Sequence, residues 1–433
     1  MLTAVAVLLV STWYLRSFVV VGPSMAQTIM GAHHRLACGA CGFEFCCGAD
    51  GPEMPGRQAI CPNCGAAGPR LDTAPRQAAD AIVVDRGAFL PRSPRRWELA
   101  AFHSPEHASQ VYVKRVVGLP GEAIELRHGD VFANGAMQRK NLAELRTIAV
   151  PVYDSRYEQD SSAARWQPDS VRSGWRRNGS RYGYIAGAGN RPTIDWLTYH
   201  HRRLRSSGEA EESAVLDEMG YNQESPVIES HYVRDLLVSC RLEIANSPVV
   251  NWSLTDGISQ FLMELDFARG EAGVTQDGRP LGRGQFQAAA EASVLFELAV
   301  CDQQVLAALD GRPLLTLPYR TPDVPFRPTS RPVAVGMRNG GLELSDLTLW
   351  RDVYYGSPPG KPPGWQARLA DDEYFVLGDN SAASLDSRAW PTAGVAASDF
   401  VGKPVLAYPC GMDKSGQERR IQVPSWRRFR YIQ

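Results

Sequence analysis

This chain of 433 residues has almost no excess of either charge sign, and it has few long apolar runs. Its 46 basic and 47 acidic side chains leave a formal net charge of -1, and no long run of one sign interrupts the sequence. Proteins that bind nucleic acid or carry charged tails usually show a surplus or a run of one sign. The composition therefore gives no sign of a nucleic-acid partner.

The one long apolar run lies at the N-terminus, over residues 2–15. No Lys or Arg precedes it, which disfavours a cleaved signal peptide, and its length fits either a buried helix or a short membrane anchor. Trp13, Tyr14 and Arg16 at its end resemble the aromatic and basic boundary of a membrane span. We expect residues 1–20 to form a transmembrane anchor.

Proline and glycine are abundant, with 30 Pro and 39 Gly. Such a chain should contain many turns and strands and few long helices. Its length allows two or three domains. The expected fold class is therefore mostly β.

Cysteine is concentrated in two CxxC pairs separated by nineteen residues. Each pair can aim two thiolates at one ion, and two pairs complete a tetrahedral shell, as in a zinc ribbon. We expect a structural zinc, because four protein ligands leave no open position for catalysis. Two disulfides are the alternative, which the adjacent Cys46 and Cys47 keep open. The expected ligands are Cys38, Cys41, Cys61 and Cys64.

Strands are expected at residues 81–84, 97–102 and 111–122, and the last of these contains Lys114 among β-branched and aromatic residues. A lysine in such a strand either faces solvent from a sheet edge or points inward, where burial lowers its pKa. Taken alone, the strand favours the solvent-facing lysine.

Residues 146–356 form a long separate block, and a Pro/Gly-rich linker follows at 357–364. The second half of the block has many strands, several of which alternate apolar and polar residues, which suggests an inserted β-sandwich or jelly roll. Its first part, around 165–191, has no clear assignment. The second half loosely resembles laminin-G and concanavalin-like sandwiches, and both a glycan ligand and a structural or protein-contact role stay open.

Two polar segments are candidates for chemistry. Ser24 lies in the turn Gly22-Pro23-Ser24-Met25, directly after the apolar run, although a serine in a turn is usually only a solvated hydroxyl. The second segment, residues 378–388, follows an apolar strand. It brings acid, amide, hydroxyl and guanidinium groups to a strand end, where polar groups can be delivered to a site.

Four short stretches, taken in their order along the chain, resemble the motifs of one protein family. They are GPSM at 22–25 after an apolar segment, ADAIVVDR at 79–86, YVKRVVGLPGE at 112–122 and GDNSAASLDSR at 378–388. Each is weak alone, but together they resemble the type I signal peptidases, the membrane-anchored Ser/Lys endopeptidases that remove secretory signal peptides. The resemblance covers the N-terminus, 79–140 and 365–433, and neither insertion.

The resemblance implies a role for each matched residue. Ser24 would be the nucleophile, Lys114 the general base, and Ser384 the hydroxyl that orients the lysine amine. Asp386 and Arg388 would form a supporting ion pair. The supporting residues would be Tyr112, Gly378, Asp379, Asn380, Ser384, Asp386 and Arg388.

The implied chemistry is physically coherent. A serine hydroxyl needs a base, and lysine serves only when neutral. Moving its pKa from about 10.4 to about 7–8 takes about 4 kcal/mol, which burial can supply. None of the eight histidines lies in the matched stretches, which argues against a Ser-His-Asp triad. The resemblance implies cleavage after small residues in an Ala-x-Ala-like pattern through an acyl-enzyme, with no catalytic cofactor.

The expected organisation places two insertions in one catalytic domain. A zinc-ribbon-like insertion would occupy residues 33–70 and the sandwich 146–356. The catalytic domain would comprise residues 21–32, 71–145 and 365–433. The resemblance implies a single-pass cell-membrane protein in contact with lipid and secretory preproteins, with its catalytic domain on the extracytoplasmic side.

Two other interpretations stay open. One is a catalytically degenerate, membrane-tethered protein that binds glycan or protein. The other is a Ser/Lys autoprotease of the repressor type, against which the apolar segment and the 378–388 stretch argue.

Overall fold

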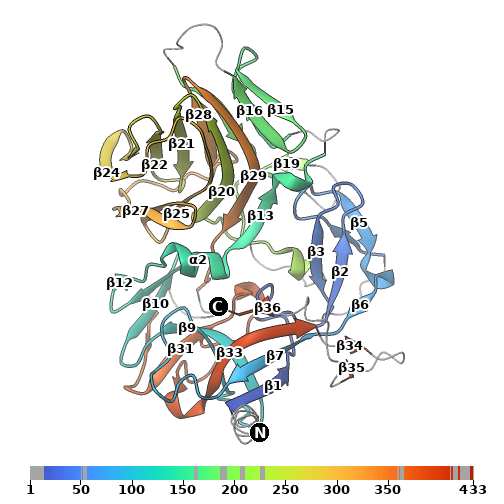
Figure 1. Cartoon of the computed structure of the whole chain (residues 1–433). Coiled ribbons are helices and arrows are strands. Elements are labelled where there is room, and N and C mark those ends of the chain that lie inside the picture. Colours follow the sequence, from blue (N-terminus) through green and yellow to red (C-terminus); the bar gives the residue numbers. More distant parts are fainter. Residues whose placement is uncertain are drawn as a thin grey trace, which may run out of the picture.

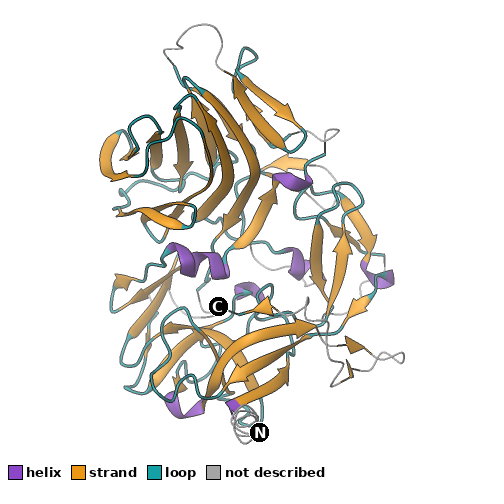
Figure 2. Cartoon of the chain, viewed as in Figure 1, coloured by secondary structure: helices purple, strands orange, loops and turns teal. Residues whose placement is uncertain are grey.

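The structure is a computed structural model that describes residues 14–49, 51, 56–159, 164–185, 193–204, 210–224, 230–357, 360, 365–409, 411–412, 418–419 and 430–432. Strands dominate it, as the sequence predicts (Figure 2). In Figure 1 a β-sandwich lies at the top, a large sheet at the bottom, and a small module at the right.

The large sheet joins strands from both ends of the sequence. Its order is β1-β7-β33-β8-β9-β31-β32, with β36 also paired to β33, and every pairing is antiparallel. The strands are β1 (Leu15–Val19), β7 (Asp80–Asp85), β8 (Leu99–His103), β9 (Val111–Gly118), β31 (Glu373–Leu377), β32 (Val395–Ala396), β33 (Phe400–Pro409) and β36 (Arg430–Tyr431). The strands expected at 81–84, 97–102 and 111–122 are therefore confirmed within a few residues.

Strand β1 corrects part of the expected transmembrane anchor at 1–20. Leu15–Val19 pairs with β7, from Leu15 opposite Asp85 to Val19 opposite Ala81, so these residues are extended and belong to the large sheet. Phe18 and Val19 are residue types that favour strands. Residues 1–13 of the expected anchor lie outside the described residues. Within the described ranges, no helix is both long and apolar enough to cross a bilayer.

A smaller sheet of order β12-β11-β10-β30 flanks the large one. Its strands are β10 (Ala123–Arg127), β11 (Asp130–Ala133), β12 (Ala136–Met137) and β30 (Ala367–Arg368). Asn134 and Gly135 connect β11 to β12 with φ angles of 51° and 77°. Two successive positive φ values are typical of an Asn-Gly hairpin turn.

The small module holds the CxxC pairs. Its elements are β2 (His33–Ala37), β3 (Glu44–Gly48), β4 (Gln58–Ile60), β5 (Ala67–Arg70), η1 (Leu71–Thr73) and β6 (Arg76–Gln77). A sheet of order β3-β2-β6 packs with the β4-β5 hairpin. Because β6 pairs with β2, this cysteine module extends beyond the expected boundary at residue 70.

The long insertion is a sandwich of two antiparallel sheets. One has the order β15-β16-β29-β20-β25-β26-β27, with β13 on β29, and the other β14-β17-β28-β21-β22-β23-β24. The first contains β13 (Val150–Asp154), β15 (Trp175–Asn178), β16 (Arg181–Ile185), β20 (Leu236–Ala245), β25 (Ala292–Cys301), β26 (Gln304–Leu309), β27 (Arg312–Pro318) and β29 (Gly341–Arg351). The second contains β14 (Trp166–Pro168), β17 (Asp195–Tyr199), β21 (Val249–Thr255), β22 (Gln260–Asp266), β23 (Glu271–Gln276), β24 (Arg279–Gln285) and β28 (Val333–Met337).

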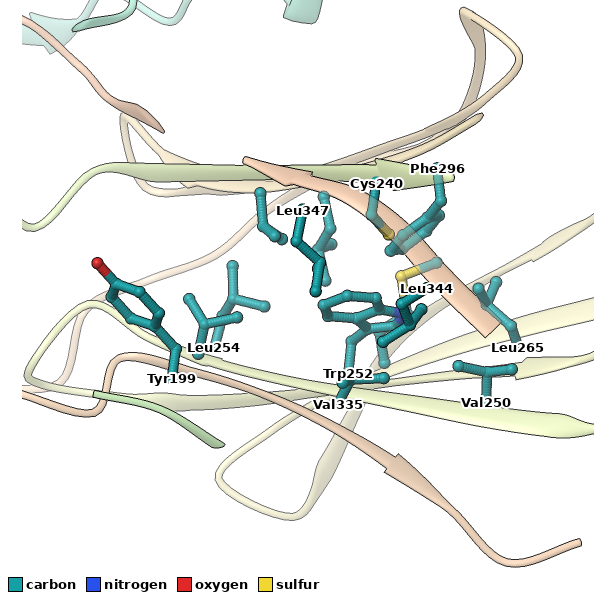
Figure 3. Packing of buried hydrophobic residues seen from close by; sticks show 14 of the residues in the cluster. Tyr199, Cys240, Val250, Trp252, Leu254, Leu265, Phe296, Val335, Leu344 and Leu347 are labelled. Carbon is teal, nitrogen blue, oxygen red and sulfur yellow. The ribbon is translucent and has the colours of Figure 1, made fainter. Parts of the chain in front are cut away.

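The sandwich core lies between the two sheets. Figure 3 shows Trp252 of β21 pointing toward residues of the facing sheet, among them Phe296 of β25. The ring centroids of Trp252 and Phe296 lie 5.3 Å apart, and both side chains are fully buried. The expected sandwich is therefore present, and β14, β15 and β16 account for much of the segment around 165–191 that the sequence left unassigned.

Short elements connect these parts. They are α2 (Leu142–Ile148), η2 (Ser155–Tyr157), β18 (Arg202–Leu204), β19 (Ala210–Glu212), η3 (Gly220–Glu224), η4 (Ser381–Ala383), η5 (Ala397–Asp399), β34 (Gly411–Met412) and β35 (Glu418–Arg419). Helix α2 begins at Asn141, which forms a capping box with Glu144. Just before it, buried Lys140 contacts Asp302 and Asp352 of the sandwich at 2.8 and 2.9 Å, which fixes the sandwich against the rest of the chain.

Candidate active site

The turn that carries Ser24 is held by apolar anchors on its C-terminal side. Met25 and Ile29 are buried in a cluster with Ile82 and Leu99 of the large sheet. Backbone hydrogen bonds from Ala26 to Pro23 and from Ile29 to Met25 close the turn. Ser24 itself stays partly exposed. The sequence thus fixes the backbone around Ser24 while leaving the residue partly accessible to solvent.

Lys114 lies in the interior of the large sheet. Its strand, β9, is flanked by β8 and β31, and its side chain is only 3% exposed. The solvent-facing edge lysine that the strand alone favoured is therefore wrong. Burial is the main cause that lowers the pKa of Lys114 to about 8, with Arg388 assisting and the carboxylates Asp386 and Asp379 opposing.

The apolar surroundings of Lys114 come from one face of β9. Tyr112 shares this face because side chains two positions apart point the same way, and its ring centroid lies 5.9 Å from the lysine Nζ. Tyr112 also stacks on Trp390 at 6.1 Å. Val111 and Val113 pack in a different cluster, with Met25 and Ile29, so they do not surround the amine as the sequence suggested.

The loop after β31 meets the Ser24 turn at Gly378. A Cβ on Gly378 would lie 2.3 Å from the Oγ of Ser384 and 2.4 Å from the carbonyl oxygen of Ser24, which no real Cβ tolerates. The β9–β31 ladder ends at the pair Leu377 and Arg115, so Lys114 lies beside the point where the chain enters this loop. The structure therefore brings the backbone of Ser24 and the side chain of Ser384 together at Gly378, with the strand of Lys114 alongside.

Asn380 ties the loop to the Ser24 turn. Its backbone N–H donates to the carbonyl of Ser24 at 3.0 Å, and its side-chain amide donates to the carbonyl of Pro23 at 3.0 Å. Asn380 is fully buried. Two hydrogen bonds to consecutive carbonyls fix the turn relative to the loop.

Asp386 and Arg388 form the ion pair that the resemblance implied. The guanidinium donates to both carboxylate oxygens, at 2.9 and 2.8 Å, and Asp386 also accepts from the backbone N–H of Gly378 at 3.1 Å. Burial alone would raise the pKa of Asp386, but Arg388 and Lys114 outweigh it and lower this pKa below its ordinary value. The Ser384 hydroxyl contributes to this lowering, although within the described residues its shielded Oγ forms no well-aligned hydrogen bond.

Asp379 has a partner that the sequence did not reveal. Arg115 donates to its two oxygens, each at 2.7 Å, and to the carbonyl of Trp97 at 2.6 Å. Asp379 also accepts from the hydroxyl of Thr28 at 2.6 Å. Both charged side chains are almost fully buried. The only signal in the sequence was that Arg115 follows Lys114, because its partner lies 264 residues away.

A cleft of about 1090 Å³ lies beside this site. Gln27, near the Ser24 turn, and Ala382, in the loop, belong to its wall, together with Phe45 and Ile60 of the cysteine module and Arg203 of the sandwich insertion. Both insertions therefore help to shape the surface beside Ser24.

The four expected metal ligands also come together, within the cysteine module. The Sγ atoms of Cys38, Cys41, Cys61 and Cys64 all lie within 4.8 Å of one another. Cys38 and Cys64 are separated by 3.5 Å and Cys41 and Cys61 by 3.7 Å, so the sulfurs are not bonded to one another.

Residues 1–174 and 354–408 match the model of the family described as signal peptidase, peptidase S26, and these ranges exceed half of the chain. The chain belongs to this signal peptidase family. The matched ranges contain Ser24, Lys114 and the whole 378–388 loop. The remaining middle of the chain, which the family model does not match, holds most of the sandwich.

Curated relatives match shorter parts of this family member. Signal peptidase I of Leptolyngbya laminosa is 32% identical over 99 residues, which are 21% of this chain and 41% of that protein. Probable signal peptidase I-2 of Synechocystis sp. is 27% identical over 83 residues, 18% of this chain and 36% of that protein. The chain thus spans about two fifths of the length of these relatives.

The chain is also similar to solved structures of β proteins. Carbohydrate-binding module CBM66 from Bacillus subtilis aligns with a TM-score of 0.24 and 10% identity, over 45% of this chain and 96% of that one. A protein of unknown function with a galectin-like fold, also from Bacillus subtilis, aligns with a TM-score of 0.29 and 7% identity, over 46% and 97%. Likeness at this level assigns no ligand to the sandwich.

Proposed function

We propose that this family member is a serine endopeptidase that removes signal peptides from secretory precursors with Ser24 as nucleophile and Lys114 as general base. The observation that carries the proposal is the environment of Lys114. Its amine is buried and has a lowered pKa, and its interior strand lies beside the junction of the Ser24 turn and the 378–388 loop. An exposed lysine would stay protonated at neutral pH and could not take a proton from serine.

The proposed cycle needs no metal and no histidine. Neutral Lys114 takes the proton of Ser24 as its Oγ attacks the scissile carbonyl, and the resulting ammonium gives that proton to the leaving amine. The acyl group then forms an ester with Ser24. A water then loses its proton to Lys114 and attacks the ester, and the ammonium returns that proton to the Ser24 oxygen as the acid product leaves.

The loop residues hold this arrangement. The Asp386–Arg388 pair places one carboxylate and one guanidinium near the amine, so their effects on its pKa partly cancel and burial dominates. In this proposal the shielded Ser384 hydroxyl, which lies against Gly378, orients the Lys114 amine toward Ser24. Tyr112 excludes water from the same face of β9.

The proposed substrate is an extended polypeptide with small residues before the scissile bond. Shallow pockets beside a strand would read alternate side chains of such a peptide, and the neighbouring cleft has room for the flanking polypeptide. Membrane anchoring by the N-terminal segment, contact with lipid, and binding of glycan or protein by the sandwich remain predictions from the sequence.

The pH dependence of cleavage tests this proposal. With a precursor that contains an Ala-x-Ala site, kcat/KM should rise about tenfold per pH unit below a midpoint near the Lys114 pKa of about 8, and level off above it. The sign follows from the base being active only when deprotonated. The measurement is initial cleavage rate between pH 6 and 10, with the cut site determined by mass spectrometry.

Two results would contradict the proposal. Cleavage that is independent of pH across this range would mean that the base is not a lysine with this pKa. Failure of the full chain to cut any Ala-x-Ala precursor in detergent or vesicles would favour the degenerate binding protein instead.

A further inference from the structure

The geometry points to a structural Zn²⁺ bound by Cys38, Cys41, Cys61 and Cys64, at a site that takes no part in the peptidase reaction. A regular tetrahedron with Zn–S bonds of about 2.3 Å has sulfur–sulfur edges of about 3.8 Å. The two measured separations, 3.5 and 3.7 Å, lie close to this edge and far from the roughly 2.05 Å of a disulfide.

The two CxxC turns have the same backbone geometry. The N–H of Gly42 donates to the carbonyl of Cys38, and the N–H of Gly65 to the carbonyl of Cys61, both at 2.8 Å. Gly42 and Gly65 have φ angles of 78° and 81°, a region that favours glycine. Each turn thereby directs its pair of thiols to a common point.

The surroundings suit thiolates bound to a metal. The N–H of Ala66 is aimed at the Sγ of Cys64 at 3.4 Å, and such a donor stabilises negative charge on sulfur. The site lies in a small module whose apolar cluster includes Cys38, Cys41 and Cys61 themselves. A module of this size gains much of its stability from a metal or cross-link.

Metal analysis of the full chain, purified under reducing conditions, tests this inference. We expect about one zinc per chain, and Co²⁺ substitution should give the absorption bands of a tetrahedral tetrathiolate. Cys61→Ser should lower bound metal at least about tenfold. Cys46→Ser, in β3 of the same module but outside the four sulfurs, should keep the metal.

The outcomes separate the alternatives. Wild-type protein without zinc, or with Cys38–Cys64 and Cys41–Cys61 disulfides found by peptide mapping, would overturn the inference. Full metal content in Cys61→Ser would do the same. The wild-type metal content and the Co²⁺ spectrum do not depend on whether Cys61→Ser folds.

A second inference comes from a different contact, and it rests on the proposed function. We infer that Asn222, in η3 of the sandwich insertion, is a positioning residue for the Ser24 turn. The side-chain amides of Asn222 and Asn380 donate to each other, each at 2.7 Å. The second hydrogen of the Asn380 amide donates to Pro23, which fixes the orientation of that amide because only its nitrogen can donate.

Asn222 thus completes the hydrogen bonds of Asn380, whose backbone N–H holds the carbonyl of Ser24. The same short helix is attached to the cysteine module, because the Gln223 side chain accepts from the N–H of Ile60 at 2.6 Å and donates to its carbonyl at 2.7 Å. Through η3, the sandwich insertion contacts the module directly and the Ser24 turn by way of Asn380.

Asn222→Ala should lower kcat on the order of tenfold, with a smaller change in KM, because a displaced nucleophile slows the chemical step. Isosteric Asn222→Asp should behave alike, since a carboxylate cannot donate to Asn380. Gln223→Ala is the matched control: it loses two hydrogen bonds in the same helix but none to Asn380, so kcat should stay near wild type.

Wild-type kcat in Asn222→Ala, or an equal loss in Gln223→Ala, would overturn the positioning role while leaving the proposed function intact. Absence of cleavage by the wild type would instead overturn the proposed function, and this inference with it.

Discussion

Lys114→Met is expected to lower kcat/KM for precursor cleavage on the order of 10⁴-fold or more, to the level of Ser24→Ala. The methionine fills the same apolar space but cannot accept the serine proton. Lys114→Arg should not restore activity, because a guanidinium stays protonated. The double variant Ser24→Ala/Lys114→Met should have a kcat/KM no lower than that of either single variant, since nucleophile and base act as a unit.

The matched control is Lys403→Met in β33, which removes a partly exposed lysine paired with Glu98 and should keep cleavage near wild type. The measurement is kcat/KM with one precursor at pH 9, where wild-type Lys114 would be largely neutral. Cleavage by Lys114→Met within about tenfold of wild type would contradict the role of this lysine.

A stability measurement shows whether the loss of activity reflects misfolding. The pKa of Lys114 is lowered to about 8 in the folded protein and is about 10.4 in an unfolded chain. Folding is therefore disfavoured by up to about 3 kcal/mol below pH 8, and the penalty disappears as pH rises through about 10. Lys114→Met should thus be more stable than wild type at pH 7 and lose this advantage at high pH.

Breaking the buried pair between Arg115 and Asp379 is expected to have the largest effect on stability. Arg115→Met should lower the free energy of unfolding of the region that contains the large sheet by about 3–5 kcal/mol. The reason is that it leaves a buried carboxylate without its cation. Activity should fall too, since Asp379 also accepts from Thr28, four residues after Ser24. Tryptophan fluorescence during denaturant unfolding measures the change.

An exposed pair provides the comparison. Arg35 and Glu44 form an ion pair in the cysteine module with both side chains more than half exposed, so Arg35→Met should cost less than about 1 kcal/mol. The double variant Arg115→Met/Asp379→Asn should recover part of the single-variant loss, because the uncompensated charge is gone. A loss below about 1 kcal/mol in Arg115→Met would show that the buried pair does not support the loop.

Much of the fold could be predicted because strands carry local signals. The strands expected in the second half of the 146–356 block are present, among them β20, β26 and β28. Asp310-Gly311 joins β26 to β27, and Asp-Gly is a sequence that favours such a hairpin turn. By contrast, Leu15–Val19 continues an apolar run, and only its pairing with β7, some sixty residues later, makes it a strand.

The site was predictable where chemistry lies in short motifs and unpredictable where it depends on long-range contacts. Ser24, Lys114 and the 378–388 loop were recognisable as stretches. The burial of Lys114 follows from β8 and β31 on either side, which no local pattern contains. Asn222 lies in an insertion that carries no catalytic motif, so nothing in the sequence indicated its contact with Asn380.

The most direct measurement of the central claim is the position of the covalent intermediate. Excess precursor would be mixed with wild-type enzyme, quenched rapidly with acid, and mapped by mass spectrometry for an acyl ester. The account predicts the signal-peptide acyl group on Ser24 in the wild type, and no adduct in Ser24→Ala or Lys114→Met. An adduct on another residue, or cleavage that continues in Ser24→Ala, would contradict it.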